Sequence, residues 1–216
     1  MRSVLVIAGA SGAGKTTVAT RLIEKLGGFE LVRSITTRAP RGDSHDGEYI
    51  YTDRANFLNK VQGGELLEYM EYGDNLYGTP ASEIERIFAE GKIPLLILDI
   101  EGVKSLRSKK FDFTPVIFYI WGKLDDIERR LYARDLSEPT AEKLLSFIKR
   151  KEMNIRDYLS MPDIEALFDA FIENTGIEET TDSVNKAFVY FNGGGEKDFS
   201  ENRRVAQSLF EMASSH

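Results

Sequence analysis

The sequence Gly9-Ala10-Ser11-Gly12-Ala13-Gly14-Lys15-Thr16 has the spacing G-x-x-x-x-G-K-[ST]. It follows an apolar run of strand length at residues 3–8 and precedes residues 17–26, whose apolar side chains recur at helical spacing. Glycines leave the backbone free to curl with its N–H groups inward, which suits phosphate oxygens at the start of a helix. The segment therefore predicts a phosphate-binding loop between a strand and a helix, and a glycine-rich turn without a ligand is the alternative.

Two side chains of this loop have roles that follow from their chemistry. The Lys15 ammonium can reach the β- and γ-phosphates of a nucleotide triphosphate, and the Thr16 hydroxyl can coordinate Mg²⁺. The motif specifies a triphosphate and leaves the acceptor of the phosphoryl group open. We expect the triphosphate to be bound by Gly9, Ala10, Ser11, Gly12, Ala13, Gly14, Lys15, Thr16 and Thr17.

The composition narrows the class of protein. A chain of 216 residues with 42% hydrophobic and 29% charged residues predicts a soluble protein with one core, or one core with an inserted lobe. A formal net charge of -7 argues against a general nucleic-acid binder, which needs a basic surface to displace counterions. With no cysteine and only a short N-terminal apolar run, we expect a cytoplasmic enzyme that binds neither nucleic acid nor membrane, as a monomer or a homodimer.

A β-rich segment interrupts the alternation of strands and helices that should follow the loop. Residues 34–41, S-I-T-T-R-A-P-R, place two arginines three positions apart, so that both guanidinium groups can hold one phosphate. A solvated loop with salt-bridged arginines is the alternative. Residues 46–51 and a hairpin across residues 73–74 predict strands, and residues 53–63 predict a helix. We therefore predict a small lobe inserted into a βαβ core.

The order of these motifs resembles guanylate kinase. The likeness covers roughly residues 1 to 190 and is carried by the phosphate loop, T-T-R-A-P-R at 36–41, D-G-E-Y at 46–49, L-E-Y at 67–69 and Y-G-T-P at 77–80. The resemblance implies an α/β P-loop kinase that phosphorylates GMP, and dGMP in the same way, with ATP and Mg²⁺. It also implies a parallel-sheet core flanked by helices at 1–32, 80–124 and 159–191, a monophosphate-binding lobe at 33–79, and a helical lid at 125–158.

On the acceptor side, the resemblance implies that GMP is bound by Ser34, Arg38, Arg41, Tyr49, Glu68, Tyr77, Thr79, Glu101 and Arg150. The arginines and tyrosines of the small lobe would hold its phosphate, and Ser34, Glu68 and Thr79 would hold the guanine. The N1–H and N2–H₂ donors of guanine can both reach the Glu68 carboxylate, whereas adenine would leave that carboxylate unsatisfied. A solvent-facing strand position is the alternative for Glu68.

The run I-P-L-L-I-L-D at residues 93–99 predicts a buried parallel strand whose carboxylate lies beside the phosphate loop. Asp99 is expected to act on Mg²⁺ through water, and it can also cap the next helix. Guanylate kinases usually have L-D-x-D-x-Q-G here, whereas residues 98–103 are L-D-I-E-G-V. Glu101 thus stands where the family's second acid helps to hold guanine, and the glutamine position is missing.

Two further helices, one opening at Asp125 and one at residues 140–158, match the family's lid over the triphosphate donor. Arg130 and Arg134 match its R-L-x-x-R segment, and Arg150 corresponds to the arginine of the next helix. Guanidinium groups there would stabilise the charge that spreads over the phosphoryl oxygens. An exposed salt-bridged helix is the alternative. Asp135 follows Arg134 where a glycine is typical, and the gap from Arg134 to Arg150 is longer than the family norm.

A last core strand is predicted at residues 170–175, and Asn174 by resemblance would approach the adenine of ATP. Together with the phosphate loop, Arg130, Arg134 and Asn174 complete the expected ATP site. The expected catalytic set is Lys15, Arg38, Arg130 and Arg134.

The tail lies beyond the family's usual end. Glycines at 193–195 predict a break after a helix at 180–191, and residues 192–216 form a glycine-rich linker with an amphipathic helix. Packing on the core, binding to a partner and contact between subunits are open alternatives for this extension.

Three other functions stay open at this point. The chain can be a related kinase for another nucleoside monophosphate or a phosphorylated ribose, or a regulatory NTPase whose output is conformational. It can also be a non-catalytic guanylate-kinase-like interaction module. Such modules typically lose the phosphate loop, which this chain keeps.

Overall fold

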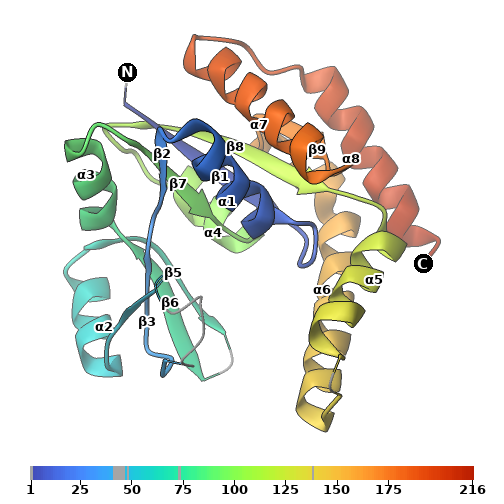
Figure 1. Ribbon diagram of the computed structural model, residues 1–216, viewed down its shortest axis with the longest axis horizontal. Helices are drawn as coiled ribbons and strands as arrows, with labels where there is room; N and C mark the ends of the chain where they lie inside the picture. The colour runs from blue at the N-terminus through green and yellow to red at the C-terminus, as the bar shows by residue number, and fades with distance from the viewer. Residues whose placement is uncertain (1, 41–46, 48, 73, 138) are drawn as a thin grey trace.

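The structure, a computed structural model, describes residues 2–40, 47, 49–72, 74–137 and 139–216 (Figure 1). Its core is a five-stranded sheet in the order β2-β7-β1-β8-β9, in which the strand pairs are parallel. The strands are β1 (Ser3–Gly9), β2 (Phe29–Leu31), β7 (Ile93–Ile97), β8 (Thr114–Trp121) and β9 (Ala170–Glu173). Parallel strands covered on both faces need apolar side chains in succession, and β1 is accordingly buried along its whole length. The predicted α/β core is confirmed.

Helices cover both faces of this sheet. α1 (Lys15–Leu26) and α7 (Ile177–Asn192) pack against each other in front of the sheet in Figure 1, and α4 (Ile100–Arg107) lies behind it. α4 begins at Ile100 because the Asp99 carboxylate accepts a hydrogen bond from the Gly102 N–H at 2.7 Å. The capping role predicted for Asp99 is confirmed.

A second sheet, with the strand order β4-β3-β6-β5, forms a small lobe of its own. Its elements are β3 (Ser34–Thr36), β4 (Tyr49–Tyr51), α2 (Arg54–Gln62), β5 (Leu66–Tyr72) and β6 (Asn75–Pro80), and α3 (Ala81–Ala89) then leads to β7. Ile35, Phe57, Leu66 and Leu76 form a separate apolar cluster inside it. β5 and β6 pair antiparallel, which confirms the predicted hairpin. The polar segment that begins at Ser34 starts as a strand, because Ile35 is buried in this cluster.

A pair of helices projects from the same side of the core as the small lobe (Figure 1). They are α5 (Leu124–Asp135) and α6 (Ala141–Ile164), and the short helix η2 (Glu165–Leu167) follows. α6 runs past its predicted end at residue 158 and through Pro162, because Tyr158 and Met161 are fully buried and extend its packing on the core. No helix in the described part of the chain, the 24-residue α6 included, has the length and apolar composition to cross a membrane.

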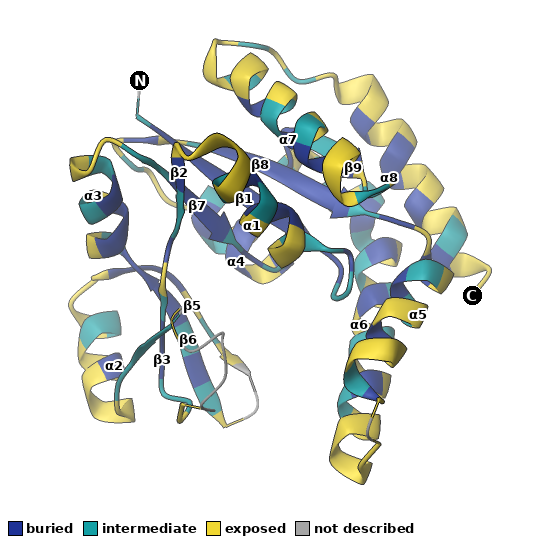
Figure 2. Cartoon of the chain, in the orientation of Figure 1, coloured by how far each residue is buried: buried dark blue, intermediate teal, exposed yellow. Residues whose placement is uncertain are grey.

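The predicted tail helix is confirmed as α8 (Phe199–Ser214), which packs most extensively against α6. Figure 2 shows buried positions recurring along one side of it, and these are Asn202, Val205, Ala206, Leu209 and Ala213. The Asn202 side chain donates a hydrogen bond to the Phe168 carbonyl at 3.2 Å, which attaches the start of α8 to the segment before β9. Of the alternatives for the tail, the structure thus shows packing on the core.

This packing predicts that α8 contributes to the stability of the whole domain. Leu209 is fully buried, so Leu209→Ala should lower the free energy of unfolding by about 2–5 kcal/mol, measured by urea denaturation. Its neighbour Phe210 is 37% exposed, so Phe210→Ala should change that free energy by less than about 1 kcal/mol. Equal, small changes in both variants would mean that α8 is only loosely attached.

Candidate nucleotide site

The phosphate loop connects the end of β1 to the start of α1, and its three glycines stand where there is no room for a side chain. Gly12 and Gly14 have φ angles of 84° and 94°, a left-handed backbone that glycine adopts without strain. A side chain at Gly9 would collide with the Ile120 carbonyl of β8, and one at Gly14 would collide with the Asn174 amide. The first turn of α1, beginning at Lys15, points N–H groups without helical partners toward this loop. The loop therefore offers a compact set of backbone donors for an anion.

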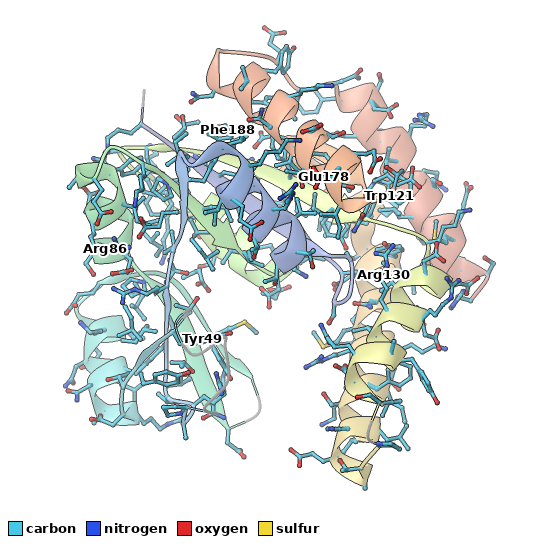
Figure 3. All side chains as sticks on the ribbon, in the orientation of Figure 1. Tyr49, Arg86, Trp121, Arg130, Glu178 and Phe188 are labelled. Atoms are coloured by element: carbon cyan, nitrogen blue, oxygen red, sulfur yellow. The ribbon has the colours of Figure 1, made fainter. Side chains whose placement is uncertain are left out.

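A cleft of about 510 Å³ lies against this loop. Its walls come from the loop and α1, from Asp99 between β7 and α4, and from both projecting helices. Besides loop residues, its lining consists of Thr17, Asp99, Arg130, Arg134, Arg150, Met153, Asn154 and Asp157. Figure 3 shows Arg130 on α5, on the side where the loop lies. Three arginines and a lysine thus face one space, as a polyanionic ligand requires.

Lys15 is bonded to its own loop in this structure. Its ammonium donates hydrogen bonds to the carbonyls of Gly9 at 2.7 Å and Ala10 at 3.0 Å. Burial lowers the pKa of Lys15 to about 8, while the charges of Asp157 and Asp99 act in the opposite direction. A phosphate entering the cleft would offer this ammonium a negatively charged partner in place of two neutral carbonyls.

One carboxylate holds two of the three cleft arginines. Arg134 donates to both oxygens of Asp135, at 2.7 and 3.2 Å, and Arg150 donates to Asp135 Oδ2 at 2.9 Å. Burial acts to raise the pKa of Asp135, but the hydrogen bonds and charges of the two arginines outweigh it and lower the pKa. Arg150, expected by resemblance on the acceptor side, lines the cleft of the phosphate loop. Asp135, where the family has glycine, therefore pairs Arg134 with Arg150 across α5 and α6.

Asp99 and Thr16 line this cleft together, whereas Glu101 does not line it. Glu101 is 71% exposed at its side chain and pairs with Lys104 at 2.7 Å on the same helix. In the described residues, no group of three or more histidine, cysteine or acidic side chains is arranged to hold a metal ion. One hydroxyl and one carboxylate suit a hard cation such as Mg²⁺ that keeps several waters and takes other oxygens from a bound phosphate. The donor set therefore fits Mg²⁺ carried in with a nucleotide.

A second, smaller pocket of about 130 Å³ lies where the small lobe meets the core. Its polar lining is Thr16, Ser34, Tyr49 and Thr79. Thr79 is 2% exposed and donates a hydrogen bond to the Glu68 carboxylate at 2.6 Å, across the β5–β6 pair. Burial raises the pKa of Glu68, and the Thr79 hydrogen bond opposes that rise. A buried carboxylate and four hydroxyl groups thus meet at this pocket or beside it.

The small lobe also brings Arg38 together with aromatic rings. The Arg38 guanidinium lies 5.1 Å from the centre of the Tyr49 ring and 5.8 Å from that of Tyr51, and the Tyr49 and Tyr77 rings are 6.3 Å apart. Figure 3 labels Tyr49 in this lobe. Three of the four residues expected to hold the acceptor phosphate are therefore adjacent, and the fourth, Arg41, lies outside the described residues.

Asn174 contacts the loop directly. Its amide donates to the Ala13 carbonyl at 2.7 Å, and its side-chain oxygen accepts from the Thr180 hydroxyl at 3.2 Å. In this structure the side chain expected beside adenine is thus part of the support of the phosphate loop.

Three further residues line the cleft that the sequence did not predict there, Met153, Asn154 and Asp157. Burial raises the pKa of Asp157 to about 6, and the charge of Lys15 opposes that rise. The available signal was helical spacing, because these positions lie three, four and seven residues after Arg150 and share its side of α6. Polar residues on a projecting helix more commonly face solvent, so the spacing alone did not single them out.

Comparisons with known proteins agree with this geometry. The sequence model of the guanylate kinase family matches residues 1–190, which ends before α8. A guanylate kinase of Parasynechococcus marenigrum is 32% identical over 83% of this chain and 93% of its own length. A guanylate kinase of Rhodopseudomonas palustris is 37% identical over 61% of this chain, and the aligned part spans 60% of that relative's length.

The fold is also similar to that of a guanylate kinase. The crystal structure of guanylate kinase from Anaplasma phagocytophilum matches with a TM-score of 0.61 and 27% sequence identity, over 87% of this chain and 85% of that one. Because a family match over most of the chain accompanies a complete phosphate loop on a parallel sheet, this chain belongs to the guanylate kinase family.

Proposed function

We propose that this protein transfers the γ-phosphoryl group of ATP to GMP, and to dGMP in the same way. The observation that carries the proposal is the position of Thr16, which lines both the arginine-rich cleft and the small pocket beside Glu68. A triphosphate in the cleft and a monophosphate in the small lobe would therefore meet at the start of α1. ATP and GMP are the substrates, and a chain without cysteine suits the cytoplasm, where nucleotides are interconverted.

We assign each part of the chain one task in this reaction. Residues 33–79 bind the monophosphate, residues 125–158 form a lid over the donor, and the rest of 1–191 is the core that carries the loop. Residues 192–216 are the extension that packs on the core through α8.

On the donor side, residues 9–17 bind the phosphates of ATP through backbone N–H groups, and Lys15 exchanges two carbonyls for phosphate oxygens. Arg130 and Arg134 face the same cleft and stabilise the charge of the transferred group. Arg150, paired with Arg134 through Asp135, acts where the two nucleotides meet. Asn174 supports the loop and contributes to the ATP site beside it.

On the acceptor side, the base is recognised by charge and hydrogen bonding. Glu68 accepts the two donors of guanine, and the hydroxyls of Ser34 and Thr79 lie beside it. Arg38 and Arg41, with Tyr49 and Tyr77, bind the GMP phosphate, and Arg38 neutralises it during transfer. Glu101, on the exposed side of α4, joins the GMP set only after the small lobe has moved toward the core.

The chemistry needs positioning and charge neutralisation and no covalent enzyme intermediate. An oxygen of the GMP phosphate forms a bond to the γ-phosphorus while the bond from that phosphorus to the β–γ bridging oxygen breaks, and ADP and GDP leave. The Thr16 hydroxyl and, through water, the Asp99 carboxylate would hold Mg²⁺ bound with ATP, which would neutralise phosphate charge. Closure of α5 and α6 would exclude water and suppress ATP hydrolysis.

The acceptor assignment is tested by ADP release from Mg·ATP with GMP, dGMP, AMP, UMP, CMP or dTMP, and without acceptor. We expect strong stimulation by GMP and dGMP only. No stimulation by GMP above the acceptor-free rate would refute the proposal, and preferential use of another monophosphate would identify a related kinase.

Removing the loop ammonium should stop transfer to every acceptor. Lys15→Met should lower kcat/KM at least about 100-fold with any nucleotide, because Lys15 acts on the donor that all reactions share. Lys60→Met is the matched control, since Lys60 pairs with Glu65 on the surface of the small lobe, and should keep full activity. Substantial GMP phosphorylation by Lys15→Met would contradict the role of the loop.

Glu68→Gln tests the recognition of the guanine base by this carboxylate. The amide cannot accept both guanine donors, so KM for GMP should rise about tenfold or more while KM for ATP stays within about twofold. Glu71→Gln on the same strand is the control, because Glu71 is half exposed and pairs with Arg54. A proportional rise in both KM values for Glu68→Gln would point to a damaged fold.

The raised pKa of Glu68 predicts a pH dependence of GMP use. As the pH falls through this pKa, which lies above the usual range of a glutamate, Glu68 gains a proton and loses the ability to accept both donors. KM for GMP should therefore rise from about pH 7 toward pH 5 in the wild type, with KM for ATP changing less. Glu68→Gln should lack this rise, and the same acid rise in that variant would assign it to another group.

A further inference from the structure

Asn154 joins the helix α6 to the phosphate loop through both backbone polar groups of one loop residue. Its side-chain oxygen accepts a hydrogen bond from the Ser11 N–H at 2.8 Å, and its amide donates to the Ser11 carbonyl at 2.9 Å. Although Asn154 lines the cleft, only 2% of its surface is exposed. Because one rigid amide makes both bonds, it fixes the orientation of Ser11 as well as its position.

A second asparagine holds the loop two residues further along the chain. Asn174, directly after β9, donates to the Ala13 carbonyl. Ser11 and Ala13, the two residues that flank Gly12, are therefore each held by one asparagine. Gly12 has a left-handed backbone, with a φ of 84°, and lies against the Leu131 side chain of α5. The backbone around Gly12 is therefore held by contacts from outside the loop.

The part of α6 that presents Asn154 is itself anchored. One turn later, the Tyr158 hydroxyl donates to the Gly122 carbonyl at 2.7 Å and accepts from the Gly122 N–H at 3.2 Å. Tyr158 is fully buried, and α8 packs along α6. By contrast, residues 141–145 at the start of α6 are all exposed. Asn154 thus lies where the helix changes from a projecting arm to a packed element.

We propose that Asn154 is a positioning residue for the donor nucleotide, which keeps the phosphate loop in its binding shape before ATP arrives. A loop rich in glycine loses much conformational freedom when it is ordered, and a loop that is already ordered binds its ligand at a lower cost. Asn154 holds backbone and not substrate, so its contribution is the same in the ground state and in the transition state. Its effect should therefore fall on ATP affinity and leave kcat unchanged.

The experiment compares Asn154→Ala with Tyr158→Phe. Each variant removes two hydrogen bonds between α6 and a backbone residue, but only Asn154 contacts the loop. Asn154→Ala should raise the Kd of Mg·ATP, measured by titration calorimetry, and KM for ATP by about five- to tenfold, with kcat and KM for GMP within about twofold. Tyr158→Phe should lower the free energy of unfolding while leaving the Kd of Mg·ATP within about twofold.

Two results would overturn the inference. In one, Asn154→Ala binds Mg·ATP as tightly as the wild type; in the other, Asn154→Ala and Tyr158→Phe weaken ATP binding equally, which assigns both residues to helix packing. Should Asn154→Ala fold poorly, Asn154→Ser provides a polar replacement that is too short to bridge both Ser11 groups and should give the same loss of affinity. Glu152→Ala, an exposed position on α6, should change neither quantity.

The inference rests on the proposed function only for the identity of the donor. Calorimetry with Mg·ATP needs no acceptor, so it reports on Asn154 even if GMP is not the substrate. If the wild type binds ATP but does not use GMP, the proposed acceptor is wrong. If Asn154→Ala binds ATP as tightly as the wild type, the proposed role of Asn154 is wrong.

Discussion

The backbone of the phosphate loop is so tightly surrounded that most of the fold can be described by what touches it. Gly9 lies against the Ile120 carbonyl of β8, Gly12 against Leu131 of α5, and Gly14 against Asn174 after β9. Each contact excludes a side chain, so the glycines are required by neighbouring elements as well as by the left-handed backbone at Gly12 and Gly14. The central strands of the sheet, the last strand and the projecting helices therefore converge on a single turn.

The cationic side chains of the cleft are bonded to internal partners that a bound phosphate can replace. In this structure Lys15 is bonded to loop carbonyls, and Arg134 and Arg150 share Asp135. An entering phosphate would replace these partners. The net free energy gained from each new contact is therefore smaller than the energy of that contact alone, as for any hydrogen bond that exchanges one partner for another. This is how a chain with a net charge of -7 can hold a polyanion locally without being a general anion binder. It also favours release of products, because each cation has an internal partner to return to.

Much of this arrangement could be predicted from local sequence, because its causes are local. The apolar runs of β1 and β7, the cap at Asp99 and the hairpin of β5 and β6 are each set by residues within a few positions, and all are confirmed. The support of the loop was not predictable in this way. Asn154 is 143 positions from Ser11, and an asparagine on a projecting helix has no local pattern that distinguishes it from a solvated one. The same applies to Asp135, whose two partners lie on different helices.

The second half of α6 is packed on the core, and α8 packs on the same helix. The family match ends at residue 190, and α8, beyond that point, packs on the same helix that continues through Pro162. Burial of Tyr158 and Met161 favours the longer α6 despite the hydrogen bond that a proline inside a helix removes. The second half of α6 is packed on the core, whereas residues 141–145 at its start are exposed and can move without disturbing that packing. Asn154, whose side chain reaches the phosphate loop, thus belongs to the same helix on which α8, outside the family match, packs.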